Sequence, residues 1–294
     1  MRWNKVTIVG VGLLGGSLGL TIKRRKLARE VAGFVRRAAS LKDCERAGAV
    51  DYATTDLLAA VSGADLIILC TPLAQMRSLV KQLLPALKRG AIVTDVGSVK
   101  ASVVRELESI IAKAGAHFVG SHPMAGAEKT GVSAARADLF ECAACVVTAT
   151  NRTNTPAMRR VEMFWKSLGC RTLGMSPVVH DELVSRSSHL PHIVASVLAS
   201  LVLNPKRPKQ QALLCANGFR DTTRIASGSP EMWRDIVQAN RAEVSKALSD
   251  FVRELQRAQK LIRSSGTKEI TQLFETAKAR RDRWLAQCIS PSPE

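Results

Sequence analysis

The chain has 294 residues, a formal net charge of +18 and an apolar fraction of 46%. This length accommodates two domains with a buried core, and the longest apolar stretch, residues 193–203, is too short to cross a membrane. The seven irregularly spaced cysteines do not form a disulfide framework, so together with the lack of a targeting segment they indicate a cytoplasmic protein.

The positive charge raises the question of a nucleic-acid partner. Lysine and arginine are spread along the chain and aromatic residues are scarce, so the sequence offers no base-stacking platform. Affinity for anionic small molecules is a sufficient explanation. We therefore expect neither a nucleic-acid nor a membrane partner. A non-catalytic protein that senses NADP or binds nucleic acid stays open as an alternative.

The first twenty residues contain a glycine motif in a specific context. An apolar, β-branched run at residues 6–9 precedes G-x-G-x-x-G, and an apolar helical pattern follows. This order indicates a dinucleotide site with the pyrophosphate at the helix N-terminus. A signal peptide or an ordinary glycine turn are the alternatives, although the basic cluster at residues 23–26 and the absence of a cleavage site disfavour the former. The cofactor-binding residues expected here are Gly10, Gly12, Leu13, Leu14 and Gly15.

The second predicted strand, Val31–Val35, ends in Arg36 and Arg37. In NAD-binding folds an acidic residue usually follows this strand and binds the ribose 2′-hydroxyl. Two guanidinium groups would instead bind a 2′-phosphate through charge-assisted hydrogen bonds. The sequence therefore favours NADP, with NAD as the alternative if the arginines simply face solvent.

Strands and helices then alternate, which predicts a doubly wound, mostly parallel sheet of the Rossmann type. Because ligands bind at the carboxyl ends of such strands, the polar residues that follow them are candidates for the site. These are Thr71 with Pro72, Ser98, and Ser121 with His122. The expected strands are 64–70, 91–95, 117–120, 143–148 and 169–173, and the expected helices are 41–48, 57–61, 75–87 and 103–112.

The pattern becomes helical near residue 175. Ser229 and Pro230 predict a helix start, and apolar residues then recur at steps of three and four as far as Ile262. Such a stripe is typical of a core or a subunit interface. We expect a dinucleotide-binding domain at residues 1–175, an all-helical substrate and dimerisation domain at 176–286, and a polar tail at 287–294.

His122 and Ser98 are the candidate catalytic residues. Histidine transfers protons near neutral pH, and Ser98 could orient this ring or bind the same substrate oxygen. A structural histidine and a helix N-cap are the alternatives. His189 and His192 lie three residues apart on one helix face, a pair too small by itself to predict a zinc site. Arg220 and Arg224 suit carboxylate recognition, or a surface salt-bridge face.

Six motifs in this order and spacing, GVGLLGGS, CTP, DVGSVK, SHPMAG, SHLPH and GFRDTTR, closely resemble the prephenate and arogenate dehydrogenases of tyrosine biosynthesis. The resemblance covers residues 5–285. It implies oxidative decarboxylation of a cyclohexadienyl acid, with hydride transfer to a nicotinamide and a homodimer joined through the helical domains.

The resemblance also implies roles for individual residues. His122 corresponds to the base that takes the ring-hydroxyl proton, and Ser98 bonds both this histidine and the hydroxyl. Arg224 corresponds to the main ligand of the substrate carboxylate, with Arg220 as a second cation. Substrate-binding roles are also implied for three further residues, His189, His192 and Glu128.

A histidine at position 192 indicates prephenate as the substrate, because its N–H can donate to the pyruvyl carboxylate and its cationic form would repel the amine of arogenate. Arogenate or both substrates stay open. Hydroxyacid dehydrogenases and imine reductases share the two-domain plan. They carry a lysine or aspartate where this chain has SHLPH.

Overall fold

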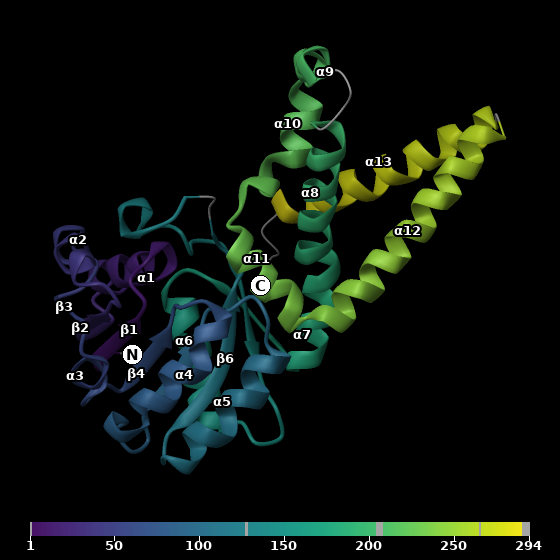
Figure 1. The fold of residues 1–294 in the computed structure, drawn as a ribbon. Coiled ribbons are helices and arrows are strands. Elements are labelled where there is room, and N and C mark those ends of the chain that lie inside the picture. Colours follow the sequence, from purple (N-terminus) through teal and green to yellow (C-terminus); the bar gives the residue numbers. More distant parts are fainter. Residues whose placement is uncertain (1, 127–128, 204–207, 265, 290–294) are drawn as a thin grey trace. The chain divides into compact units, whose positions relative to one another are not determined.

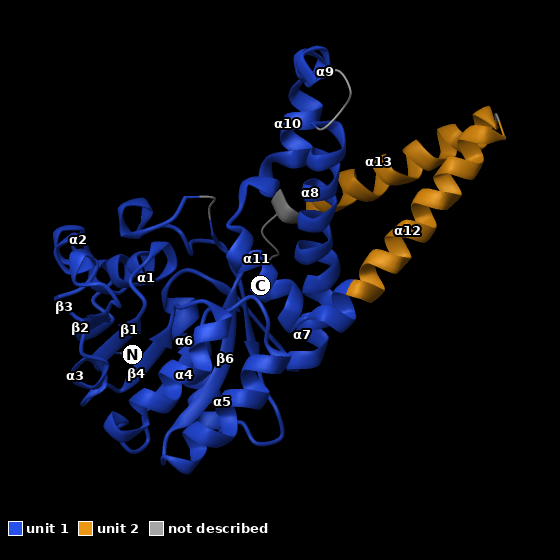
Figure 2. Cartoon of the chain, in the orientation of Figure 1, with its two compact units in different colours: residues 1–244 blue, residues 245–294 orange. Residues whose placement is uncertain are grey.

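The computed structural model describes residues 2–126, 129–203, 208–264 and 266–289. The chain divides into two compact units, residues 1–244 and residues 245–294, which Figure 2 shows in different colours. Residues 290–294 of the expected polar tail lie outside the described residues, and α13 continues through residues 287–289. Among the described helices none is long and apolar enough to span a membrane.

Within unit 1 the strands form one sheet in the order β3-β2-β1-β4-β5-β6-β7-β8 (Figure 1). The strands are β1 (Trp3–Val9), β2 (Ala28–Phe34), β3 (Tyr52–Thr54), β4 (Leu66–Leu69), β5 (Ile92–Asp95), β6 (His117–Pro123), β7 (Ala144–Thr148) and β8 (Arg171–Met175). Pairing from β3 to β6 is parallel, and β7 runs antiparallel to β6. This arrangement confirms the expected doubly wound sheet.

Helices cover both faces of the sheet. One apolar core includes residues of α1 and α6, and the other includes residues of α3, α4 and α5. The four residues of β4 are buried on both faces, as expected for a central parallel strand. The helices of this part are α1 (Leu13–Arg24), η1 (Ala38–Ser40), α2 (Leu41–Arg46), α3 (Leu57–Val61), α4 (Leu73–Leu83), η2 (Leu84–Ala86), α5 (Ala101–Lys113), η3 (Val132–Ala134) and α6 (Thr155–Ser167).

The chain is helical after β8, as the sequence predicts. The elements are α7 (Pro177–Val184), the π-helical segment η4 (Ser185–His189), α8 (Leu190–Val202), α9 (Pro208–Leu214), α10 (Asn217–Thr223), η5 (Arg224–Ser227), α11 (Pro230–Ala239), α12 (Arg241–Arg263) and α13 (Thr267–Ile289).

Several elements differ from the sequence-based expectation. The predicted strand at residues 117–120 continues to Pro123, because antiparallel pairing with β7 extends it, so His122 lies within β6 rather than after it. The single helix expected from Pro230 to Ile262 is two helices, α11 and α12, which meet at Asn240. Helix α6, which the sequence analysis missed, begins with Asn154 accepting a hydrogen bond from the Ala157 amide at 2.9 Å.

Candidate active site

A cavity of about 510 Å³ lies at the carboxyl ends of β1, β2 and β4. It occupies the point at which the sheet order reverses between β1 and β4, where dinucleotides bind in this fold. Its lining brings together three of the predicted segments, namely the glycine turn, the end of β2 and the Cys-Thr-Pro turn after β4. The predicted cofactor residues that line it are Gly10, Gly12, Arg36, Arg37, Thr71 and Pro72.

The geometry of the glycine turn fits a dinucleotide. Gly10 has φ +102°, and a Cβ on Gly15 would lie 2.1 Å from the Gly10 carbonyl oxygen, so both positions need glycine. A Cβ on Gly12 would meet nothing within 4 Å, which leaves space for a pyrophosphate above the start of α1. The hydroxyl of Thr71 is buried and has no hydrogen-bond partner among the described residues. Leu13 and Leu14 form the first turn of α1.

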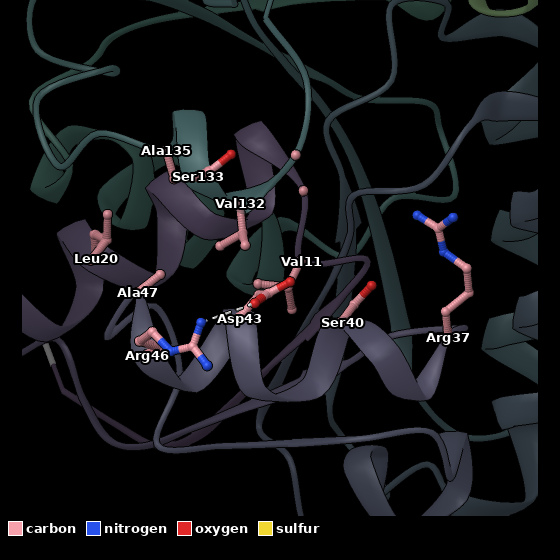
Figure 3. A pocket seen from close by; sticks show the side chains of 12 residues that line it. Val11, Leu20, Arg37, Ser40, Asp43, Arg46, Ala47, Val132, Ser133 and Ala135 are labelled. Carbon is pink, nitrogen blue, oxygen red and sulfur yellow. Dashed lines mark ion pairs between the residues drawn. The ribbon is translucent and has the colours of Figure 1, made fainter.

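A second cavity of about 720 Å³ adjoins the first and shares four lining residues with it: Val11, Gly12, Arg37 and Ser40. Figure 3 shows Arg37 and Ser40 on the side of α2, with Val132 and Ser133 of η3 opposite. Asp43 and Arg46 form an ion pair of 3.6 Å in its wall. Arg37 and Ser40 therefore belong to both cavities.

His122 connects the sheet to the first helix of the helical region. Its Nδ1 lies 2.8 Å from Nε2 of His180 in α7, and Nδ1 of His180 lies 2.7 Å from Oδ1 of Asp181. All three side chains are buried. Burial lowers the pKa of His122 well below its ordinary value, and His180, Lys100 and His189 lower it further. The ring is therefore neutral at pH 7 and able to accept a proton.

His189 and His192 lie together beside Trp233 of α11. The His192 ring stacks on the indole, with centroids 3.6 Å apart, and the His189 ring meets it edge-on at 6.2 Å. Burial lowers the pKa of His192, and it lowers the pKa of His189 to about 4. Nε2 of His189 and Nδ1 of His192 are buried and have no hydrogen-bond partner of ordinary geometry among the described residues, although the Ser98 backbone lies close to the His189 ring.

The remaining predicted residues are less closely grouped. Ser98 is half-buried between β5 and α5, and its backbone lies beside His189, where it raises that pKa slightly against the effect of burial. Arg220 on α10 and Arg224 at the start of η5 are exposed, and η5 packs against α8, which carries His192. Glu128 lies outside the described residues. The described residues contain no group of three or more His, Cys, Asp or Glu side chains that could hold a metal.

Sequence reasoning missed several residues of this region. Lys100 is fully buried, where it pairs with Asp95 and donates to the Ser121 carbonyl at 2.9 Å, which fixes the chain next to His122. Its position in the DVGSVK motif was a usable signal. The adjacent pair His180 and Asp181, inside an otherwise apolar helix start, was another. Nothing local in the sequence marks Trp233 or Asn240, because both act through contacts distant in the chain.

Sequence models of the prephenate dehydrogenase nucleotide-binding domain and of the prephenate dehydrogenase dimerization domain match residues 18–173 and 176–276. The prephenate dehydrogenase of Bacillus subtilis is 33% identical over 282 residues, covering 94% of this chain and 75% of the relative. The cyclohexadienyl dehydrogenase of Zymomonas mobilis is 31% identical and covers 94% of both chains.

Similarity to solved structures agrees with these sequence matches. The prephenate dehydrogenase from A. aeolicus, solved in complex with hydroxyphenyl propionate and NAD+, superposes with a TM-score of 0.90 at 32% identity. The match covers 96% of this chain and 99% of that one. Together with the sequence models, these similarities identify a nicotinamide-dependent oxidoreductase. The chain belongs to the prephenate dehydrogenase family.

Proposed function

We propose that the protein is a prephenate dehydrogenase, which oxidises and decarboxylates prephenate to 4-hydroxyphenylpyruvate. The observation that carries this proposal is the buried, neutral His122 at the carboxyl end of β6, in the same sheet whose carboxyl edge carries the dinucleotide cavity. Family membership supports the substrate class.

In this proposal His122 takes the proton of the ring hydroxyl, and Ser98 bonds that hydroxyl and orients it. The nicotinamide cofactor, when bound, accepts the hydride from the carbon that bears the hydroxyl. Loss of the ring carboxylate as CO₂ then gives the aromatic ring. Arg224, assisted by Arg220, holds a substrate carboxylate.

In this proposal His189 and His192 form the substrate side of the site, next to Trp233. Because burial lowers the pKa of His192, its ring is neutral at pH 7 and recognises the pyruvyl carboxylate through N–H donation rather than charge. A neutral ring does not repel an amine, which favours some use of arogenate as a second substrate. The cyclohexadienyl dehydrogenase relative supports this alternative. Replacing His192 with Asn should reduce kcat/KM for prephenate more than for arogenate; an equal loss for both would remove its discriminating role.

For the cofactor we propose NADP in preference to NAD. Arg36 and Arg37 follow β2 at the cavity wall, and Ser40, which Figure 3 shows near Arg37 in one of the two cavities, adds a hydroxyl donor to both. These three groups suit a 2′-phosphate. The NAD+ complex of the A. aeolicus relative favours the other cofactor. Arg36→Ala with Arg37→Ala should raise KM for NADP and leave KM for NAD nearly unchanged.

We further propose a homodimer formed by the helical region, with domains at residues 1–175 and 176–286. The match to a dimerization domain over residues 176–276 supports both. So do the exposed apolar side chains of the helices, which a second copy would cover. They include Val197, Leu201, Leu213, Leu214, Ile262 and Phe274. Sedimentation should give a dimer mass, and Leu201→Glu should lower it toward a monomer.

The decisive experiment is the absorbance of the reduced nicotinamide with purified protein, using prephenate or arogenate combined with NADP or NAD. We expect turnover with prephenate and NADP, and loss of turnover in His122→Asn. Absence of cofactor reduction in all four combinations would refute the proposed function.

A further inference from the structure

A chain of buried hydrogen bonds ends at His122. It runs from Asp181 Oδ1 to His180 Nδ1 over 2.7 Å, and from His180 Nε2 to His122 Nδ1 over 2.8 Å. The His180 side chain is fully buried and Asp181 is 3% exposed. Water therefore does not compete for these protons, and the partners alone determine which nitrogen carries each one.

The carboxylate sets the direction of this chain. Asp181 also accepts hydrogen bonds from the Lys100 amide at 2.7 Å and the Ala101 amide at 2.9 Å, so it acts as an acceptor toward every partner. Nδ1 of His180 must then carry a hydrogen, and in the neutral imidazole this leaves Nε2 of His180 as an acceptor. Nδ1 of His122 donates to that acceptor, and the lone pair of His122 is on Nε2.

Asn240, at the junction of α11 and α12, makes Nδ1 of His189 a hydrogen-bond acceptor, whereas Nδ1 of His122 is a donor. Its side-chain nitrogen donates to the Asp181 carbonyl at 2.8 Å and lies 3.3 Å from Nδ1 of His189. An amide nitrogen only donates, so Nδ1 of His189 accepts. The hydrogen of the neutral ring is then on Nε2, which is buried and has no hydrogen-bond partner of ordinary geometry among the described residues, although the Ser98 backbone lies close enough to the ring to raise its pKa.

We propose that Asp181, His180 and Asn240 are positioning residues that hold His122 and His189 in opposite tautomers. His122 presents a bare Nε2, and His189 presents an Nε2–H that donates to a substrate oxygen. When the ring-hydroxyl proton moves to Nε2 of His122, the Nδ1–H of the resulting cation stays bonded to His180, and Asp181 stabilises the charge. The inference rests on the proposed function only in taking His122 as the base.

Both rings are neutral at pH 7, which makes the tautomers well defined. The charged and titratable groups that act on His122 are His180, Lys100 and His189, and each lowers its pKa in addition to burial. For His189, burial outweighs the raising effect of Asp181.

The tautomers can be read directly from long-range ¹H–¹⁵N correlation spectra of the ¹⁵N-histidine protein at pH 7, without substrate. The chain has five histidines, so single His→Gln variants assign every signal. We expect the Nδ1–H form for His122 and His180 and the Nε2–H form for His189. An Nε2–H form of His122, or the same form for His122 and His189, would overturn the proposal.

Variants of Asp181 and Asn240 test whether these residues determine the tautomers of His122 and His189. Asp181→Asn should shift His122 toward Nε2–H and lower kcat by about a hundred- to ten-thousand-fold with little change in KM. Asn240→Asp should convert His189 to Nδ1–H. Asp282→Asn, the same change on an exposed ion pair of α13, should alter neither spectrum nor kinetics. If Asp181→Asn only reduced the folded fraction and the folded molecules kept the His122 tautomer, the residue would be merely structural.

The two proposals fail separately. If the spectra show the expected tautomers but His122→Asn keeps full prephenate turnover, the role of His122 as base is wrong and the positioning inference stands. If His122→Asn abolishes turnover but His122 carries its hydrogen on Nε2, the proposed function stands and the positioning inference is wrong.

Discussion

The imidazole of His192 lies flat against the indole of Trp233, with the ring centroids 3.6 Å apart and the planes inclined by 14°. A Cβ on Gly228 would lie 2.7 Å from the indole nitrogen and 3.1 Å from the His192 ring, so the backbone confines the stack as well. The orientation of His192 therefore depends on Trp233, a residue 41 positions along the chain.

Trp233→Leu should weaken substrate binding, because the stack contributes about 0.5–1.5 kcal/mol, or roughly two- to twelvefold in KM. The value of kcat should change little, since the chemistry at His122 is separate. Trp233→Phe, which keeps an aromatic face, should restore most of the binding. Steady-state kinetics with prephenate measure both variants, and identical KM values for Leu and Phe would contradict the role of stacking.

The glycine turn supplies a matched pair of variants. Gly15→Ala should destabilise the fold by about 3 kcal/mol or more, because the new methyl would lie 2.1 Å from the Gly10 carbonyl oxygen. Gly12→Ala, with open space at that position, should cost no more than about 1 kcal/mol and mainly weaken cofactor binding. Thermal unfolding and cofactor titration separate the two effects; equal destabilisation would show that Gly12 is not open.

The buried pair of Lys100 and Asp95 should dominate local stability. Lys100→Met leaves the Asp95 carboxylate buried without its cation and should lower the free energy of unfolding by about 3–5 kcal/mol. Lys88→Met, which breaks a partly exposed pair with Asp65, should cost no more than about 1 kcal/mol. Urea unfolding measures the free energy of unfolding of both variants, and similar losses would contradict the larger contribution of the buried pair.

Stability should fall on acidification below pH 6.5. The pKa of His189 is about 4 in the folded protein and about 6.5 in the unfolded chain, so between these values the unfolded chain binds more protons. This group alone should lower the free energy of unfolding by about 3 kcal/mol from pH 7 to pH 4. His189→Gln should flatten the profile in that window, and parallel profiles for variant and wild type would contradict the assignment.

Local patterns were sufficient for most of the fold. Continuous apolar runs and glycine turns predicted β1, β4 and β5 within a few residues, because buried parallel strands have a simple signature. The extension of β6 through His122 was not predictable in this way, since it depends on pairing with β7, more than twenty residues later. The break at Asn240 carries no proline or glycine, and the Asn240 side chain contacts the Asp181 carbonyl and His189, which are distant in the sequence.

Some residues of the candidate site were predictable from the sequence, and others were not. Residues within compact motifs, such as Gly12, His122 and His189, could be proposed for the site from their neighbours in sequence. His180, Asp181 and Asn240 were not, because their significance lies in which nitrogen they contact. Contacts of this kind leave no recurring pattern in the sequence, so they can be recognised only in the structure.

The two backbone amides that begin α5 are capped from elsewhere in the chain. Lys100 and Ala101 donate to the carboxylate of Asp181, and the N-cap residue of α5 provides no side-chain cap of its own. The nucleotide-binding and dimerization regions are therefore not interchangeable modules. A chimera joined near residue 175 would keep the start of α5 capped only if the incoming helical region carried an acid at the position of Asp181. This requirement limits which homologous helical regions can replace the native one, and it cannot be seen from either region by itself.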